Sequence, residues 1–326
     1  MPDQPRIPEL PPNMSSASET GSASRLEQLT RQLREALGDE RLCVEAWRQG
    51  VDFWADLAMR DGERVGVLRS PRQEVLQTSY EGTVDFADTL AKEIEVLDLL
   101  KSRGVPVPGV HAWRRRRDAG ERSWMLCEHI VHQPATRLDT RQERDLGRWT
   151  RKIHAIHPQS ATLARAPVWC DAMLTRLEGR LSAAHRHCAD IPVTALLAQA
   201  GAVFAERQAE ATSLLHMDLR PENLCIADGR IEAIIDVANA MVGDPWLELG
   251  RIRAYGLLTP AFLEGYGLSP SALAPMARPL GFYEIETCAL LMTVAVEEAD
   301  LPELFETSRH RAIELADTLV RRGTWP

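Results

Sequence analysis

The chain has 326 residues, of which 44% are apolar and 26% charged, and this composition suits a soluble protein with room for two lobes. Its net charge of -9 argues against nonspecific binding to nucleic acid and is compatible with a cationic small molecule as partner.

The cysteines and the amino end bear on the cellular compartment. Six scattered cysteines without a Cys-x-x-Cys pair indicate buried free thiols, which fit a reducing cytoplasm. The amino end has neither an apolar run long enough to span a bilayer nor a secretion signal. We therefore expect a cytoplasmic protein that does not bind a membrane.

The first third of the chain predicts a tail, two helices and a small sheet. Residues 1–24 are rich in proline, serine and threonine, and we expect a disordered tail there. Leucines at every third or fourth position from Leu26 to Leu37 predict an amphipathic helix. Apolar runs and turn signals then predict three strands at residues 41–47, 53–59 and 64–69, and a second helix at residues 86–103. Residues 72–82, before this helix, are expected to form a loop without assigned structure.

The rest of the chain changes from strands to helices. Two further strands are predicted on either side of a charged turn, at residues 111–113 and 123–130. Apolar residues at helical spacing then predict helices at residues 146–156, 169–186, 193–211, 261–265, 283–298 and 303–321. This order predicts an α+β protein with an antiparallel-sheet lobe over residues 25–130 and a mainly helical lobe over residues 131–326.

Two short apolar segments of the second lobe carry four polar side chains, His216, Asp218, Asn223 and Asp236. An Asp-Gly pair at residues 228–229 predicts a hairpin turn that brings Asn223 and Asp236 near each other. Phosphoryl transfer needs an oxygen that orients the attacking hydroxyl and oxygen ligands that hold magnesium against the phosphates. Asp218 can supply the first, and Asn223 and Asp236 can supply the second.

The spacing H-x-D-x-x-x-x-N matches the catalytic loop of protein kinases, but other interpretations are open. His216 and Asp218 can satisfy each other's hydrogen bonds in a core while Asp236 caps a turn. A metal-dependent phosphohydrolase would need further histidine ligands, and none accompanies the cluster. A protein kinase would need D-F-G and A-P-E motifs, which the sequence lacks.

Residues 213–251 resemble the core of the aminoglycoside phosphotransferase and choline kinase family. The family pattern is H-G-D-L-x-x-x-N, then I-D-[FW], then G-D-P-x-x-D-L-A, and this chain has HMDLRPEN, IIDVANA and GDPWLELG. It departs from the pattern at Met217 for glycine, Val237 for an aromatic residue, and Glu248 and Gly250 for aspartate and alanine. The resemblance implies a two-lobe protein-kinase-like fold and transfer of a phosphoryl group from ATP, or GTP, with Mg2+ to a small-molecule hydroxyl.

The resemblance also assigns roles in the catalytic loop. Asp218 would be the catalytic base, and Asn223 and Asp236 the magnesium ligands. His216 and Asp244 would support the loop, Asp244 as a buried carboxylate that steadies it. Retention of Asp218, Asn223 and Asp236 together argues against a second class of function, a catalytically inactive nucleotide-binding module.

In the first lobe, the kinase-like fold implies a phosphate site. The turn at Gly50 would cover the nucleotide phosphates, although an ordinary hairpin explains that glycine equally well. Arg69, at the end of the segment VGVLRSP, would replace the usual lysine and bind the α- and β-phosphates. Glu93, on the following helix, would hold Arg69 by an ion pair. The alternative for Arg69 and Glu93 is an exposed surface position.

Shorter segments of the sequence predict where the adenine and the acceptor would bind. Backbone groups at the inter-lobe hinge would bind the adenine, at Glu128, His129 and Ile130. Acidic residues of the late helices would line a pocket that suits an amine-bearing acceptor, or they would simply face solvent. These residues are Glu284, Glu286, Glu297, Glu298 and Asp300. The sequence predicts neither the acceptor nor the oligomeric state.

Overall fold

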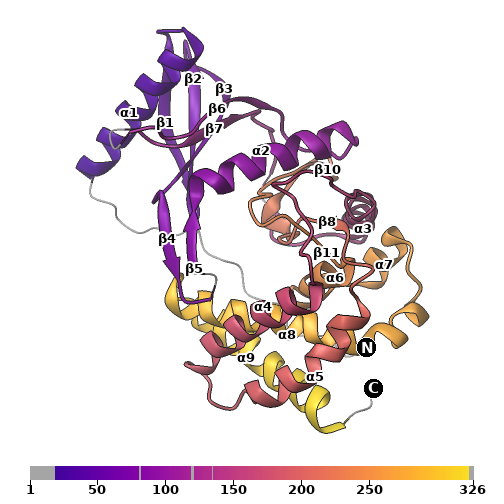
Figure 1. Cartoon of the computed structure of the whole chain (residues 1–326). Coiled ribbons are helices and arrows are strands. Elements are labelled where there is room, and N and C mark those ends of the chain that lie inside the picture. Colours follow the sequence, from indigo (N-terminus) through magenta and orange to yellow (C-terminus); the bar gives the residue numbers. More distant parts are fainter. Residues whose placement is uncertain (1–18, 81, 119–120, 134, 323–326) are drawn as a thin grey trace. The chain divides into compact units, whose positions relative to one another are not determined.

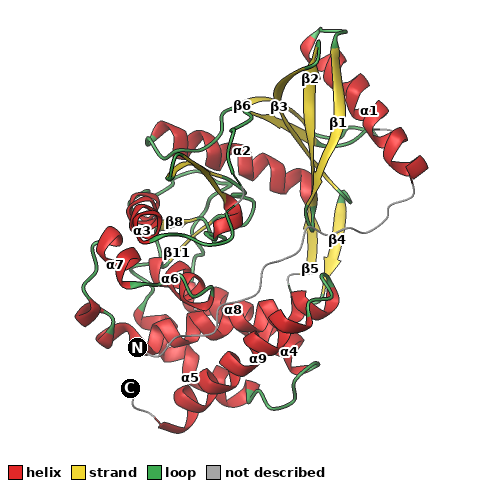
Figure 2. Cartoon of the chain, turned by 180° about the vertical axis from the view of Figure 1, so that it is seen from behind, coloured by secondary structure: helices red, strands yellow, loops and turns green. Residues whose placement is uncertain are grey.

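The computed structural model describes residues 19–80, 82–118, 121–133 and 135–322. These residues fall into two compact units, which we describe separately. The smaller unit comprises the described residues up to 132 except for residues 78–82, which belong with the described residues beyond 132 in the larger unit. Strands concentrate in the smaller unit and helices in the larger one, so the predicted α+β class is confirmed (Figures 1 and 2).

The smaller unit contains a five-stranded antiparallel sheet, in the order β1-β2-β3-β7-β6. Helix α1 packs against β1, and helix α2 contacts β6 and β7 (Figure 1). The bounds of these elements are α1 (Glu19–Leu37), β1 (Leu42–Gln49), β2 (Phe53–Arg60), β3 (Glu63–Pro71), α2 (Phe86–Ser102), β6 (Val110–Arg114) and β7 (Trp124–Cys127). Each predicted strand and helix of this lobe is therefore present.

Helix α1 begins before the predicted helix. It starts at Glu19, so the prediction of a disordered tail is wrong for residues 19–24, while residues 1–18 lie outside the described residues. The leucine face of α1 enters the core of the sheet, where Leu29 and Leu33 are fully buried. A buried ion pair between Arg25 and Asp56 also joins the helix to β2.

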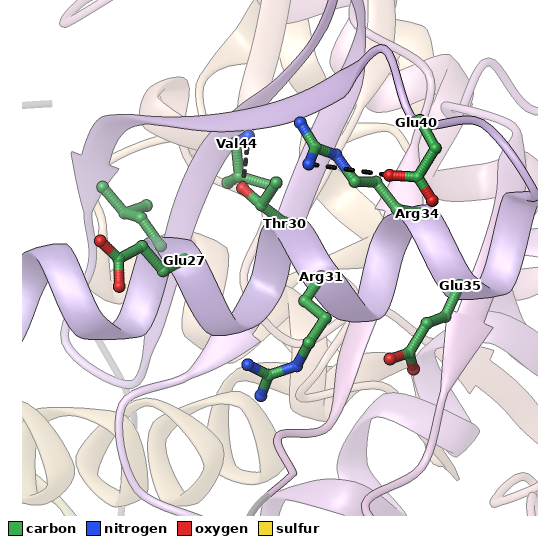
Figure 3. A pocket seen from close by; sticks show the side chains of 8 residues that line it. Glu27, Thr30, Arg31, Arg34, Glu35, Glu40 and Val44 are labelled. Atoms are coloured by element: carbon green, nitrogen blue, oxygen red, sulfur yellow. Dashed lines mark hydrogen bonds and ion pairs between the residues drawn. The ribbon is translucent and has the colours of Figure 1, made fainter.

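A groove of about 470 Å³ runs between α1 and β1 (Figure 3). Its lining mixes acidic and basic side chains, and Arg34 lies 3.8 Å from Glu40. The hydroxyl of Thr30 accepts the Val44 N–H at 3.0 Å, which ties the helix to the strand. None of the predicted nucleotide-binding residues lines this groove.

A two-stranded hairpin occupies much of the segment to which the sequence assigned no structure. Its strands are β4 (Val75–Thr78) and β5 (Gly82–Asp85). The residues of β4 alternate between exposed and half-buried, and those of β5 are exposed except for the half-buried Val84, so the segment lacks the apolar run by which strands are recognised. Asp85 ends the hairpin and caps α2, since its carboxylate accepts the backbone N–H groups of Ala87 and Asp88.

The larger unit combines helices with two short antiparallel ribbons, β9 with β10 and β8 with β11. Its helices are α3 (Thr140–His154), α4 (Trp169–His185), α5 (Val193–Glu206), α6 (Pro245–Ala254), α7 (Pro260–Tyr266), α8 (Ala277–Glu297) and α9 (Pro302–Asp317), with short turns η1 (Pro221–Asn223), η2 (Pro270–Ala272), η3 (Ala274–Met276) and η4 (Thr318–Arg322). Its strands are β8 (Ser213–Leu215), β9 (Leu224–Ala227), β10 (Arg230–Ile234) and β11 (Met241–Gly243). The sequence had predicted neither β8, β11 nor α6.

Helix α8 forms the centre of the larger unit and contacts α4, α5, α6 and α9. Residues 270–297, which include α8, are apolar and long enough to cross a membrane, but 83% of the most apolar window is buried inside the protein. Burial of most of the helix explains its largely apolar sequence, because a helix with one solvent face would carry polar residues at every third or fourth position.

Gly250 lets α6 approach α8 closely. A Cβ atom at this position would lie 2.6 Å from the Cβ atom of Tyr283 and 3.0 Å from the backbone nitrogen of Glu284. The structure thus explains why glycine stands where the family pattern has alanine.

We expect Gly250→Ala to destabilise the protein by about 1–3 kcal/mol, because backbone atoms of α8 would have to move. Gly201→Ala on α5 is the matched control, since its new Cβ atom would meet only a side-chain carbon of Leu174, at 3.7 Å. That control should be neutral or stabilising by up to about 1 kcal/mol. Denaturant unfolding measures both changes, and equal stability of the two variants would contradict the close approach.

Candidate active site

The catalytic loop follows β8 and is held by a buried histidine. His216 is 1% exposed, and its Nδ1 accepts the backbone N–H of Asp218 at 3.2 Å. Since Nδ1 accepts, the ring proton is on Nε2, which donates to the carbonyl oxygen of Ile235 at 3.1 Å. One neutral imidazole therefore fixes both the backbone of Asp218 and the residue before Asp236, as its predicted supporting role requires.

Glu248 is the carboxylate that steadies the loop. It lies on α6, is 1% exposed, and accepts the backbone N–H groups of His216 at 3.0 Å and Met217 at 2.5 Å. The ring of His154 contacts the same carboxylate at 2.8 Å. Burial raises the pKa of Glu248, but the hydrogen bond and charge of His154 and the hydrogen bond from the backbone N–H of His216 bring its pKa below the ordinary value. The sequence had treated Glu248 only as a departure from the family pattern.

Asp244 is buried as predicted, and among the described residues its hydrogen-bond partners lie outside the loop that it was expected to steady. Its carboxylate accepts two hydrogen bonds from Arg207, at 2.7 and 3.0 Å, and one from the hydroxyl of Tyr283 at 2.9 Å. It also caps α6 by accepting the Trp246 N–H at 3.1 Å. Asp244 therefore joins α5, α6 and α8, and it supports the loop only through the position of α6.

Met217 stands in a left-handed backbone conformation, with φ of 68°. Glycine adopts this conformation freely, whereas a side chain raises its energy by about 1–2 kcal/mol. The side chain is 1% exposed and packs in the core of the larger unit. Apolar burial and the two N–H bonds to Glu248 offset the backbone strain, so methionine is accommodated where the family pattern has glycine.

Asp218 and Asn223 form a hydrogen-bonded pair. The Nδ2 of Asn223 donates to Oδ2 of Asp218 at 2.8 Å and to the backbone carbonyl of Asp218 at 2.9 Å. With its nitrogen fixed in this way, the Oδ1 of Asn223 is the atom left for a metal ion. The turn η1, which ends at Asn223, sets the spacing between the two residues.

Two arginines and a tyrosine surround the carboxylate of Asp218. Arg220 Nε lies 3.3 Å from Oδ2, and Arg251 lies 3.7 Å from Oδ1. The hydroxyl of Tyr255 donates to Oδ1 at 2.8 Å. Burial raises the pKa of Asp218, but Arg220, Arg251 and Tyr255 outweigh it and lower the pKa below the ordinary value. The carboxylate is thus ionised at neutral pH, the state that a base requires.

Arg220, Arg251 and Tyr255 did not emerge from the sequence as site residues. Arg220 lies inside the quoted motif, two residues after Asp218, so its charge and spacing were the available signal. Arg251 and Tyr255 follow the motif on α6 and at its end, and no pattern marks them. Their position depends on how α6 packs against the loop.

Asp236 ends the hairpin of β9 and β10. The backbone N–H of Ile235 donates to the carbonyl of Asn223 at 3.0 Å, which makes Asn223 and Asp236 neighbours at the open end of the hairpin. Asp236 has φ of 63°, and such strain in a non-glycine residue is common at functional sites. The prediction that the Asp-Gly hairpin brings the two oxygen donors together agrees with this geometry.

The donor atoms suit Mg2+ and not a metal that needs several side-chain ligands. Mg2+ prefers oxygen, keeps several waters, and is bound by one or two carboxylates together with substrate phosphates. An amide oxygen of Asn223 and a carboxylate of Asp236 match that need. Within the described parts of the chain, no group of three or more His, Cys, Asp or Glu side chains could hold a metal ion.

In the smaller unit, Arg69 and Glu93 form an ion pair. Glu93 is fully buried on α2, and the guanidinium of Arg69 also stacks over the ring of Phe53 at 4.8 Å. Neither residue occupies the exposed surface position that was the alternative. The role of this pair in binding phosphates stays a prediction.

Gly50 forms an ordinary hairpin turn. Its N–H donates to the carbonyl of Phe53 at 2.8 Å, so it is not available to a phosphate. A side chain of Arg72 further ties the loop by donating to the carbonyl of Val51 at 2.9 Å. The N–H of Gly50 is thus used within the turn, and the role of this turn in covering the nucleotide phosphates stays a prediction.

The three predicted hinge residues differ in their free backbone groups. The N–H of Glu128 donates to the carbonyl of Gly109 at 2.8 Å and cannot bind adenine. The carbonyl of Ile130 contacts the ring of His132 at 2.8 Å. The backbone of His129 makes no hydrogen bond with the described residues, and its ring packs edge-on against Trp47. Among the three, only His129 has both its backbone N–H and its carbonyl without a hydrogen bond to the described residues.

The acidic residues of the late helices do not form an open anionic surface. Glu284 is fully buried and bonded by Arg311, at 2.7 and 3.1 Å. Glu286 is fully buried between Arg176 and Arg180. These two carboxylates are compensated within the protein, and the expectation that they line a site for a cationic acceptor is not supported.

Glu297 and Glu298, at the end of α8, are also occupied. Glu297 bonds Arg186 at 2.8 Å and Ser79 at 2.7 Å, and these partners with His187 lower its pKa to about 2 although burial raises it. Glu298 accepts the hydroxyl of Tyr80 at 2.6 Å. Of the five predicted acidic residues, only Glu297 and Asp300 are exposed.

Comparison with known proteins gives a family that agrees with the geometry of the site. The model of the phosphotransferase enzyme family, APH, matches residues 64–283, which is more than half of the chain. A comparison with curated proteins found no match.

Solved structures share the fold at low sequence identity. A GDP complex of a mutant aminoglycoside 2'-phosphotransferase-IIIa is 16% identical with a TM-score of 0.65, covering 92% of this chain and 100% of that one. Spectinomycin phosphotransferase APH(9)-Ia with ADP and spectinomycin is 14% identical with a TM-score of 0.57, and the match covers 90% of this chain and 98% of that one. The ternary complex of streptomycin, ATP and APH(2")-IIa is 14% identical with a TM-score of 0.58, and the match covers 90% of this chain and 97% of that one. The family model covers β6, β7 and nearly all of β3 in the small sheet, the motif from His216 to Asn223, and the hairpin of β9 and β10, so the chain belongs to the phosphotransferase enzyme family.

Proposed function

We propose that the chain is an ATP- and Mg2+-dependent phosphotransferase that moves the γ-phosphoryl group to a hydroxyl of a small molecule. The observation that carries the proposal is the bonded pair of Asp218 and Asn223 beside Asp236. An ionised carboxylate, an amide oxygen and a second carboxylate are the groups that this reaction needs from a protein. The family supports transferase chemistry, and the intact set of three side chains supports a catalyst over an inactive nucleotide-binding module.

The contacts suggest a role for each residue. Asp218 orients the acceptor hydroxyl and takes its proton, while Asn223 and Asp236 hold the metal. When bound there, Mg2+ would neutralise negative charge on the phosphates. In the smaller unit, Arg69 held by Glu93 pairs the α- and β-phosphates. Because the transition state is loose, positioning and charge neutralisation supply most of the rate gain.

We propose a hydroxyl acceptor that need not carry several positive charges. Two of the solved relatives bind spectinomycin or streptomycin, and these compounds belong in any test. In this chain, however, Glu284 and Glu286 are compensated by arginines and leave no buried negative charge for an amine. Amino alcohols and uncharged sugars are therefore equal candidates.

The six free cysteines support a cytoplasmic location.

The function can be tested by incubating the protein with MgATP or MgGTP and a panel of aminoglycosides, amino alcohols and uncharged sugars. Mass spectrometry should find one phosphoryl group added to at least one compound, and ATP should be the better donor. Asp236→Ala should lower this transfer by about 100-fold or more, because the metal loses its carboxylate ligand. A protein that is stabilised by MgATP in a thermal shift assay but phosphorylates nothing would instead be the inactive nucleotide-binding module.

A further inference from the structure

The two carboxylate oxygens of Asp218 have different partners. Oδ2 faces two nitrogen donors, Asn223 at 2.8 Å and Arg220 at 3.3 Å. Oδ1 accepts one hydrogen bond, from the hydroxyl of Tyr255 at 2.8 Å, and Arg251 at 3.7 Å is too far for a second. Each carboxylate oxygen offers about two lone-pair positions. Oδ1 therefore keeps one position for the acceptor hydroxyl.

The direction of the hydrogen bond from Tyr255 is fixed by Arg251. Nε of Arg251 lies 2.9 Å from the Tyr255 hydroxyl oxygen, and a guanidinium can only donate. The tyrosine oxygen accepts that bond, so its own proton is directed to Oδ1 of Asp218. Arg251, Tyr255 and Asp218 thus form a chain in which each group donates to the next.

This chain of donors is anchored on one helix. Arg251 lies in the last turn of α6, and Tyr255 is the residue that ends the helix, four positions later. Arg251 is 6% exposed, and its guanidinium lies 5.8 Å from the centre of the Tyr255 ring. Because α6 also carries Glu248, which holds the backbone of the loop, one helix sets both the backbone and the side chain of the loop around Asp218.

We propose that Tyr255 is a positioning residue, whose hydroxyl, directed by Arg251, holds Oδ1 of Asp218 so that its second lone pair receives the acceptor hydroxyl. The inference rests on the proposed function. In the transfer, the acceptor proton moves to Oδ1 as the acceptor oxygen bonds to the γ-phosphorus. The bond from that phosphorus to the bridging oxygen breaks, and its electron pair leaves with the nucleoside diphosphate. Tyr255 keeps its own proton throughout.

The test compares Tyr255→Phe with Tyr80→Phe. Both variants remove a tyrosine hydroxyl bonded to a carboxylate, but Tyr80 donates to Glu298 at 2.6 Å and not to the catalytic loop. With water as the acceptor, kcat for MgATP hydrolysis should fall about 100-fold in Tyr255→Phe, while KM for MgATP stays within about twofold. Tyr80→Phe should leave both constants unchanged. An unchanged kcat in Tyr255→Phe would overturn the proposal, as would a loss that appears only in KM.

A spectroscopic test does not depend on activity. The chain has only four tyrosines, so 3-fluorotyrosine labelling gives four fluorine resonances, each assigned by a Tyr→Phe variant. Asp218→Asn should shift the resonance of Tyr255 and leave that of Tyr80 in place, and an unmoved Tyr255 resonance would overturn the inference. Wild-type protein that transfers phosphate to neither water nor any compound of the panel would overturn the proposed function, and the fluorine spectrum would still decide whether Tyr255 holds Asp218.

Discussion

Asp218→Asn should slow phosphoryl transfer by about 10²- to 10⁴-fold, the usual contribution of a general base. The amide has the size of the carboxylate but cannot take the proton of the acceptor. It also brings an NH2 group beside either the Asn223 amide or the Tyr255 hydroxyl, both of which donate to Asp218 in the structure. Single-turnover measurement with saturating MgATP separates the chemical step from nucleotide binding.

The matched control for this variant is Asp228→Asn. Asp228 is an exposed residue in the turn of the hairpin that ends at Asp236, and it has φ of 51°, which asparagine adopts readily. The control removes one negative charge from the same hairpin and should keep full activity. Transfer by Asp218→Asn within tenfold of the wild-type rate would rule out the assigned base.

Glu248→Ala should destabilise the protein by about 3–5 kcal/mol, the range for removing one partner from a buried charged contact. The change leaves the backbone N–H groups of His216 and Met217 without an acceptor inside the protein, and it leaves His154 without its carboxylate. The strained backbone of Met217 would then lose the bonds that hold it. Denaturant unfolding followed by circular dichroism measures the loss.

Two comparisons make this prediction specific. Glu222→Ala removes a glutamate that is 34% exposed on the same loop, and it should change the stability by no more than about 0.5 kcal/mol. The second comparison uses pH. Because the pKa of Glu248 is lowered in the folded protein, its contribution is complete above the ordinary value of 4.5 and is lost as the pH falls through the folded value. Glu248→Gln should flatten the acid side of the stability curve, and a parallel curve would contradict the role.

Local signals in the sequence were sufficient for the donor atoms of the site. The Asp-Gly turn between two apolar segments predicted the hairpin, and the structure pairs Asn223 with Ile235 beside Asp236. The spacing of the motif likewise marked Asp218 and Asn223 as site residues, and the structure joins them by a hydrogen bond across five positions. Such contacts lie within a few residues or across one tight turn, where chain geometry leaves few alternatives.

The supports of the site depend on packing between distant segments, which the sequence did not reveal. Glu248 contacts Met217 across 31 positions, and Tyr255 reaches Asp218 across 37. The pattern attributed loop support to Asp244, but the capping bond to Trp246 and the pair with Arg207 direct that carboxylate elsewhere. Nor does the sequence show that the N–H of Gly50 is bonded within its own turn.

The position of α8 near the end of the chain has a consequence for synthesis. The catalytic loop leaves the ribosome well before residues 277–297, yet α8 supplies the centre of the core and the hydroxyl of Tyr283 that bonds Asp244. Until that helix emerges, the faces of α4, α5 and α6 that pack on α8 stay uncovered, and the nascent chain is open to chaperones and proteases. A premature stop codon just before α8 would therefore preserve every motif residue of the active site and still yield no enzyme.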